Sequence, residues 1–295
     1  MATSPEALNG VLAIDKPVGP SSHDAVAMAR RALGTRRIGH TGTLDPFASG
    51  LLLLCVGSAT RIAEYLTARP KTYQAVMRLG AATDTDDRTG RVVAEADGWR
   101  ALGADAVRAA LASQAGRRLQ RPPAYSAKQV DGERLYARAR RGEPVQPKPV
   151  EVEVLAISLT AWEPPDASFE VTCSSGTYIR AIARDVGAEL ETYGHLVALR
   201  RTAIGEARVE VAVALDQLAA HGLQQPLIPA LQALAGMPAV RVDDAEAADL
   251  RHGRAIAAPA DAPSGIVAVD WAGELLAIAE AVDGRLRPRK VLAHA

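Results

Sequence analysis

The sequence predicts an α/β or α+β protein with a smaller, β-rich region at its carboxyl end. Strand-like apolar runs alternate with helix-like runs through the first two-thirds of the chain, and short strands with glycine-containing turns follow residue 238. The chain has 295 residues, of which 48% are hydrophobic and 23% charged. This length allows about two globular domains.

The first elements are predicted from apolar runs and from one helix-start signal. Ser21 and Asp24 have the spacing of a capping box, which places a helix start between them. The predicted strands cover Gly10 to Ile14, Leu51 to Val56 and Tyr73 to Leu79, and the predicted helices cover Ser22 to Leu33 and Ser58 to Thr67.

A strand, a turn and a helix are predicted further along. Phe169, Val171 and Cys173 alternate with polar residues, and the turn Ser174-Ser175-Gly176 follows. The apolar positions of the next helix, at helical spacing, are Ile179, Ile182, Val186 and Leu190. Arg180 and Arg184 then share another face, where they repel each other slightly, so we expect at least one to reach an anionic partner.

A domain boundary is predicted near residue 237. Residues 221–238 are rich in Gln, Pro and Ala, and strands over Gly265 to Val269 and Leu275 to Ile278 follow. The expected domains are therefore residues 1–237 and 238–295.

Composition argues against several classes of protein. The longest apolar run, Leu51 to Val56, is far shorter than the ~18 residues of a membrane span, and the first ten residues lack a signal-peptide pattern. Cys55 and Cys173 form no metal-ligand spacing. We expect a reduced, cytoplasmic protein without a metal site.

The formal charge is zero, but it is unevenly distributed. Residues 100–150 carry eleven basic and four acidic groups, concentrated between Arg117-Arg118 and Arg140-Arg141, with Tyr125 and Tyr136 interleaved. This pattern is typical of a loop-and-helix arm on a phosphate backbone. A solvated basic helix face explains it equally well, and the residues alone leave both open.

The most unusual stretch is the loop from Gly39 to Gly50, with sequence GHTGTLDPFASG. It lacks the lysine of a phosphate-binding P-loop. Taken alone, Asp45 is a turn residue before Pro46, and His40 is a hydrogen-bonded loop histidine.

A second acidic stretch, Asp84 to Gly90, fails as a calcium loop because Arg88 and Thr89 occupy key positions, and a solvated hairpin is predicted instead.

The loop Gly39 to Pro46 resembles the signature of the TruB family of pseudouridine synthases, the bacterial tRNA pseudouridine-55 synthases. Further matches follow in the family's order over roughly residues 10–210: Asp15-Lys16-Pro17, Gly57 to Arg61, Lys71-Thr72-Tyr73, Leu79-Gly80 with Thr83 to Asp86, Pro122-Pro123 with Tyr125 to Ala127, Leu135 to Arg138, Cys173 to Arg180, and Leu199-Arg200-Arg201. The resemblance implies an α+β pseudouridine synthase fold with a mixed, largely antiparallel sheet flanked by helices. It also implies a PUA-like carboxyl-terminal domain.

The implied reaction breaks the C1′–N1 bond of a uridine in the T arm of tRNA and rejoins the base through C5. The resemblance makes Asp45 the catalytic aspartate, which acts at C1′, at C6 of the base, or as a base on the sugar. Arg180 keeps that carboxylate ionised and aimed. Tyr73 lies against the base and moves a proton at C5. On the residues alone, Tyr73 is a core tyrosine and Arg180 a surface cation.

Other roles are also implied by the resemblance. His40 fills the space left by a flipped uridine, Leu199 and Tyr178 contact the substrate, and Lys16 supports the signature loop. Arg117, Arg118, Arg140 and Arg141 contact the RNA backbone. Arg285, Arg287, Arg289 and Lys290 could contact phosphates locally.

The resemblance implies a monomer that needs no cofactor, no metal and no protein partner. Two alternatives remain. One is a guide-RNA-dependent synthase acting on ribosomal RNA, disfavoured because the arm at 117–141 resembles the stand-alone bacterial insertion. The other is a tRNA-folding chaperone with secondary catalysis.

Overall fold

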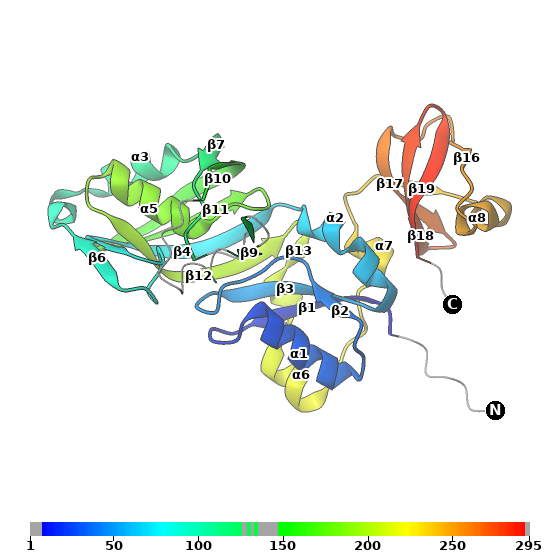
Figure 1. Cartoon of the computed structure of the whole chain (residues 1–295), viewed down its shortest axis with the longest axis horizontal. Coiled ribbons are helices and arrows are strands. Elements are labelled where there is room, and N and C mark those ends of the chain that lie inside the picture. The colour runs from blue at the N-terminus through cyan, green and yellow to red at the C-terminus, as the bar shows by residue number, and fades with distance from the viewer. Residues whose placement is uncertain (1–7, 126–128, 131–132, 135–146, 293–295) are drawn as a thin grey trace. The chain divides into compact units, whose positions relative to one another are not determined.

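The computed structural model describes residues 8–125, 129–130, 133–134 and 147–292 (Figure 1). They form two compact units, which we call the outer unit and the central unit after their places along the sequence. The outer unit comprises the chain up to Pro46, Gly50–Ala68 and the residues from Gly205 onward, and the central unit comprises Phe47–Ser49 and Arg69–Ile204. Within these ranges, no helix is long and apolar enough to cross a membrane.

The first part of the outer unit packs two helices on the strands β1, β2, β3 and β14. β1 pairs antiparallel with β3 and parallel with the short β14, and β2 pairs with β3. Helices α1 and α6 lie side by side, blue and yellow in Figure 1, and bury their apolar faces against β1 and β3. The elements are β1 Gly10–Lys16, α1 Ser22–Leu33, β2 Ile38–His40, β3 Ser49–Val56, the 3-10 helix η1 Gly57–Ile62, α2 Ala63–Thr67, β13 Ala207–Arg208, η3 Val209–Val211, β14 Val213–Ala214, α6 Leu215–His221 and α7 Ala230–Ala233.

The start of α1 confirms the capping-box prediction. The Ser21 hydroxyl accepts a hydrogen bond from the Asp24 amide, and the Asp24 carboxylate accepts one from the Ser21 amide. The helix predicted over Ser58 to Thr67 differs, because its first part is 3-10. There the Thr60 hydroxyl donates to the Gly57 carbonyl, and such side-chain bonds compete with regular α-helical pairing.

The carboxyl-terminal residues of the outer unit form a separate five-stranded sheet with its own core. Its strand order is β15-β17-β18-β19-β16, and helix α8 contributes Ala247 and Leu250 to the core. The elements are β15 Ala239–Arg241, α8 Asp244–Arg251, β16 Ile256–Ala257, β17 Gly265–Trp271, β18 Glu274–Val282 and β19 Arg285–Val291. The predicted strands near residues 265 and 275 are therefore confirmed.

The central unit is built on an antiparallel sheet with the strand order β12-β4-β11-β10-β7. Helix α5 packs on β12 and β4, and α3 packs on β10 and α5. In Figure 1, α3, α5, β10 and β12 are drawn in shades of green and β4 in cyan. The elements are β4 Lys71–Leu79, β5 Ala81–Thr83, β6 Val92–Glu95, η2 Gly98–Ala101, α3 Ala104–Ala112, β7 Gly116–Gln120, β8 Gln129–Val130, β9 Glu133–Arg134, β10 Val150–Glu163, β11 Asp166–Cys173, α5 Ile179–Glu189 and β12 Gly194–Ile204.

These pairings confirm the predicted fold class. The strands are mostly antiparallel, with parallel pairs such as β1–β14, helices flank them, and a small β-rich sheet lies at the carboxyl end. The alternation of Phe169, Val171 and Cys173 places all three on the buried face of β11. Ile179, Ile182 and Val186 are buried on α5, as their spacing predicts.

Candidate active site

The signature loop of the outer unit is fixed by hydrogen bonds on both sides of Asp45. The Leu44 amide donates to the Ser22 hydroxyl at 2.8 Å, and the Gly19 amide donates to the Pro46 carbonyl at 2.8 Å. The first turn of α1 and the segment before it thus hold the residues flanking Asp45. Asp45 itself is half-buried. This fixed backbone would position a carboxylate within the loop.

Lys16 fixes the segment that precedes α1. Its side chain is fully buried, and its ammonium donates to the carbonyls of Pro17 and Pro20 at 2.8 and 2.9 Å. These bonds fix the turn that contains Gly19, which in turn contacts Pro46. Lys16 is therefore tied to the signature loop through the backbone of residues 17–20.

His40 ends β2 at the entrance to the loop. It is half-buried, its Nδ1 accepts a hydrogen bond from the Gly42 amide at 3.3 Å, and its ring meets the His23 ring edge-on at 5.4 Å between centroids. The ring is thus held at the loop by two neighbours.

Tyr73 and Leu199 share one face of the central sheet. On neighbouring antiparallel strands, Tyr73 of β4 lies opposite Arg201 of β12, and Ala75 lies opposite Leu199. Residues opposite each other, and alternate residues along a strand, point to the same face. Tyr73 and Leu199 are consequently diagonal neighbours, and each is 8% exposed.

Two buried cations lie on this face beside Tyr73. Lys71 is two residues before Tyr73, and the exposed fractions of Lys71 and Arg201 are 5% and 1%. Burial, followed by repulsion from Arg201, lowers the pKa of Lys71 to about 8. Burial also raises the pKa of the Cys173 thiol, opposite Lys71 on β11, to about 11. Lys71 and Arg201 lie in motifs that match the family, but no role was predicted for them, although they alternate with Tyr73 and Leu199 along the two strands.

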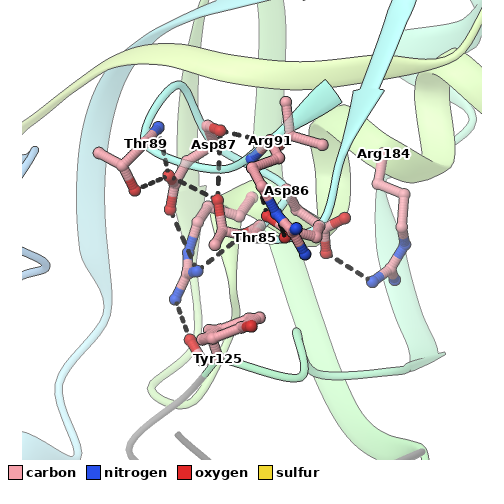
Figure 2. Close-up of polar contacts among 10 residues, drawn as sticks. Thr85, Asp86, Asp87, Thr89, Arg91, Tyr125 and Arg184 are labelled. Carbon is pink, nitrogen blue, oxygen red and sulfur yellow. Dashed lines mark hydrogen bonds and ion pairs between the residues drawn. The ribbon is translucent and has the colours of Figure 1, made fainter. Parts of the chain in front are cut away.

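Arg180, in the first turn of α5, is buried in a polar network. Figure 2 labels three of its partners, Thr85, Asp87 and Tyr125. Its Nη1 donates to the Thr85 carbonyl at 2.9 Å and contacts Asp87 Oδ2 at 3.2 Å. Its Nη2 donates to the Tyr125 carbonyl at 2.9 Å. An arginine that the helix pattern alone makes a surface cation is thus inside the protein, held by one carboxylate and two carbonyls.

Residues 84–90 form the turn of the β5–β6 hairpin, which confirms the predicted hairpin, but Asp87 is not solvated. Its side chain is 5% exposed, and its Oδ1 accepts hydrogen bonds from the Thr85 hydroxyl and from the Thr89 amide and hydroxyl, as Figure 2 shows. Asp87 can be buried because its carboxylate has enough donors to offset the cost of leaving water, whereas Arg88 and Thr89 in the same turn are exposed. In the sequence, the sign that Asp87 has hydrogen-bond donors close by was the presence of Thr85 and Thr89, each two residues away.

Arg184 lies one helical turn beyond Arg180. Like Arg180, it contacts the turn at residues 84–90 and the segment at residues 121–125. Its Nη1 contacts Asp86 Oδ2 at 2.9 Å, and its Nη2 donates to the Arg121 carbonyl at 2.9 Å. Burial raises the pKa of the Asp86 carboxyl, and the charge of Arg184 opposes that shift. Both arginines of the pair have anionic partners, so the expectation of at least one is confirmed.

Tyr178 immediately precedes α5 and is joined to β7. Its amide and carbonyl are hydrogen-bonded to the side-chain amide of Gln120, at 2.8 and 3.1 Å. Its half-buried side chain follows the Ser174–Thr177 turn. The start of α5, and with it Arg180, is thereby fixed to the strand that leads to Tyr125.

The basic arm is only partly described. Arg117 and Arg118 lie on β7, the last strand in the order of the central sheet, so the arm begins as a strand and the loop-and-helix prediction is wrong there. The strand forms because residues 116–120 pair with β10. Arg117 is exposed and contacts Glu153 at 3.7 Å. Tyr136, Arg140 and Arg141 lie outside the described residues.

The basic cluster on β19 is largely occupied by partners in the outer unit. Arg289 contacts Glu280, Arg287 contacts Asp283 at 3.9 Å, and Lys290 contacts Glu64 at 2.5 Å. Arg285 donates to the Ala255 carbonyl. Three of these four cations therefore already have carboxylate partners, which weakens the expectation that they contact phosphates.

Comparison with solved structures defines the class of fold. The chain aligns over 99% of its length with 91% of a chain in "Crystal Structure of a Cbf5-Nop10-Gar1 Complex" (TM-score 0.73, 25% identity). It aligns over 99% with 92% of a chain in "Structure of H/ACA RNP bound to a substrate RNA containing 2'-deoxyuridine" (TM-score 0.74, 24% identity). The protein thus has the α+β pseudouridine synthase fold with a small carboxyl-terminal β domain.

The sequence comparisons identify the family. Residues 30–179 match the amino-terminal domain of the TruB family pseudouridylate synthases, and residues 237–293 match the carboxyl-terminal domain of tRNA pseudouridine synthase II. The chain is 44% identical over 294 residues to tRNA pseudouridine synthase B of Thermobifida fusca (97% of this chain, 99% of the relative). It is 43% identical over 298 residues to that of Burkholderia mallei (97% of each). The chain belongs to the TruB family of pseudouridine synthases, and the enzyme is an isomerase.

Proposed function

We propose that this enzyme converts uridine 55, in the T arm of tRNA, to pseudouridine without a guide RNA. The observation that carries the proposal is the full-length similarity, at 44% and 43% identity, to relatives named as tRNA pseudouridine synthase B. The signature loop GHTGTLDP supports it, because its backbone on both sides of Asp45 is held by buried Ser22 and by Gly19.

Asp45 is the proposed catalytic carboxylate. Carboxylates labilise glycosidic bonds by attacking the anomeric carbon or by stabilising its positive charge. In this reaction Asp45 acts at C1′, at C6 of the base, or as a base on the sugar. Attack at C1′ or proton removal from the sugar releases the base, whereas attack at C6 keeps the base bonded to Asp45 while the C1′–N1 bond breaks. In each route the base turns, C5 bonds to C1′, any bond to Asp45 is broken, and C5 loses a proton while N1 gains one. The overall change is an isomerisation, so no atom or electron is gained or lost.

Arg180 supports the carboxylate and Tyr73 handles the proton in this proposal. A guanidinium keeps a nearby carboxylate ionised against the desolvation that accompanies a bound base. Arg180 suits this role because its position is fixed by Asp87 and by two backbone carbonyls. The ring of Tyr73 lies against the base and its hydroxyl transfers the proton at C5, with Leu199 beside it on the same sheet face.

The target uridine must leave its stack before it can be reached. His40, held at the entrance of the signature loop by Gly42 and His23, fills the vacated position. Tyr178 contacts the substrate next to Arg180, and Lys16 supports the loop from its buried position. The basic arm with Arg117, Arg118, Arg140 and Arg141 binds the tRNA backbone. In this proposal the enzyme works as a monomer, without a cofactor.

The guide-RNA-dependent alternative is less well supported. The chains of the H/ACA RNP and Cbf5-Nop10-Gar1 structures are 24–25% identical to this chain, whereas the relatives named as tRNA enzymes are 43–44% identical over comparable coverage. The low identity to the former supports a shared fold alone. The chaperone alternative requires that binding of the protein helps tRNA to fold even when no pseudouridine is formed.

The experiment incubates the purified protein with an unmodified tRNA transcript, without guide RNA, and maps pseudouridine at base resolution. We expect a single modified position, uridine 55, and no product in a matched transcript with cytidine there. Modification only after a guide RNA is added, or at another site, would overturn the proposal. Tight binding without product would favour the chaperone alternative.

A further inference from the structure

A second basic surface lies on the outer unit, distant in sequence from the basic arm. No acidic residue occurs between Asp24 and Asp45, and four arginines do: Arg30, Arg31, Arg36 and Arg37. Averaging over residues 1–70 hides this cluster, because that segment carries seven basic and five acidic groups. We call these four residues the α1–β2 basic surface.

The four arginines are brought together where α1 turns into β2. Arg30 and Arg31 occupy the last turn of the helix, and Gly34 then reverses the chain with a left-handed φ of 63°. Arg30 Nη2 donates to the Ile38 carbonyl at 2.9 Å, which ties the end of the helix to the first residue of β2. Arg36 and Arg37 lie in the short connection between these two points, and all four residues are exposed.

Within the described residues, these arginines have no carboxylate partner, whereas other exposed arginines such as Arg78 and Arg254 have one. Within the described residues, none of the four forms an ion pair, whereas Arg100 and Arg108 each lie beside an aspartate three residues away. Arg37 Nε donates to the Thr60 hydroxyl at 3.2 Å. The side chains of Arg31 and Arg36 make no hydrogen bond in that part of the structure.

Helix stability explains only part of this arrangement. Cations in the last turn of a helix interact favourably with its dipole, which accounts for Arg30 and Arg31. Arg36 and Arg37 lie beyond the helix, where the dipole effect fades, and four like charges within eight residues repel one another. A polyanion would remove this repulsion, and guanidinium groups bind phosphate oxygens in bidentate geometry.

We propose that the α1–β2 basic surface binds backbone phosphates of the RNA substrate. It therefore rests on the proposed function, whose substrate is tRNA. The strand β2 that follows Arg37 ends at His40, so the same three-residue strand joins the surface to the signature loop. Phosphates held here would fix the RNA close to the loop that contains Asp45.

The test compares two double variants that remove the same charge. Arg31→Gln/Arg36→Gln removes two cations without an acidic partner, and the matched control Arg100→Gln/Arg108→Gln removes two cations that are each paired with an aspartate. Binding of an unmodified tRNA transcript is measured over a salt series, together with kcat at saturating tRNA.

We expect the first variant alone to bind roughly tenfold more weakly at moderate salt. The slope of log K against log salt should fall by about 1.4–1.8, because each lost phosphate contact contributes about 0.7–0.9. kcat should stay close to the unaltered value. Arg31→Lys/Arg36→Lys should retain most of the slope, since the charge remains.

Equal slopes for both double variants would overturn the inference, because the effect would then be one of net charge. An unchanged slope in the first variant would overturn it as well. These outcomes are separate from a failure of the proposed function, which would be an absence of pseudouridine at position 55 with the unaltered enzyme.

Discussion

Arg180 of α5 and Asp87 of the turn after β5 form an ion pair, Nη1 to Oδ2 at 3.2 Å, in which the side chains are only 4% and 5% exposed. A buried carboxylate with three further donors at its other oxygen cannot easily move. The position of the guanidinium is therefore determined by a turn that lies more than ninety residues earlier in the chain. This relationship yields the first prediction.

Asp87→Asn should destabilise the protein and reduce kcat. The change leaves the buried guanidinium without its counter-charge, and removing one partner of a buried pair costs about 3–5 kcal/mol. Urea unfolding and single-turnover pseudouridine formation measure the two effects. Asp84→Asn is the control, because Asp84 in the same turn pairs with an Arg91 side chain that is 89% exposed. That surface pair is worth at most about 1 kcal/mol. Equal, small losses in both variants would contradict the prediction.

Tyr73→Phe should still fold and bind tRNA but form product at least about 100-fold more slowly. The phenyl ring retains the packing of a residue that is 8% exposed, but it cannot transfer a proton. The measurement is a single-turnover rate at saturating tRNA, with affinity determined separately by filter binding. A rate near that of the unaltered enzyme would remove Tyr73 from the chemistry and leave it a core residue.

Alanine at Arg117, Arg118, Arg140 and Arg141 should weaken tRNA binding and reduce its salt dependence. Each phosphate contact that is lost lowers the slope by about 0.7–0.9. Arg117 already has Glu153 at 3.7 Å, so its contribution should be smaller than that of an arginine without a partner. An unchanged salt slope in the fourfold variant would show that the arm is only a solvated basic face.

Lys71 provides a pH-dependent prediction. Its pKa in the folded protein is about 8, against a usual 10.5, so holding the charged form in the core costs stability below pH 8. Between pH 8 and 10.5 the folded state releases this proton while the unfolded state keeps it, and the cost disappears. The free energy of unfolding of the unaltered protein should therefore rise, relative to Lys71→Met, between pH 7 and pH 9.5.

Urea unfolding of both proteins at these two pH values measures the change. Cys173 is present in both proteins, and burial, rather than the charge of Lys71, is the main cause of its raised pKa. A difference between the proteins that is independent of pH would contradict the lowered pKa of Lys71.

The sequence predicted secondary structure correctly where that structure depends on residues close together in the chain. The capping box of Ser21 and Asp24, and the alternation at Phe169 and Val171, depend on neighbours along the chain, and both are confirmed. The loop around Asp45 was recognisable because its glycines and proline restrict the backbone in an unusual order. The family that this loop indicated is the family to which the chain belongs.

Interactions between distant segments could not be predicted in the same way. The burial of Asp87 depends on Arg180, ninety-three residues away, and a run of aspartates and threonines otherwise favours a solvated turn. The strand character of Arg117 and Arg118 likewise depends on β10, which begins at Val150. Charge and turn signals indicate where a segment is polar, whereas its pairing partner decides whether it is buried or extended.

The most direct test of the account is Asp45→Asn. This substitution keeps the shape of the side chain and removes its charge, so it should abolish detectable pseudouridine at position 55 of an unmodified tRNA transcript. Affinity for the transcript should stay within roughly tenfold, about 1.4 kcal/mol, because many phosphate and base contacts share the binding energy. Conversion of that uridine at a rate near that of the unaltered enzyme would contradict the assignment of Asp45 and the mechanism that depends on it.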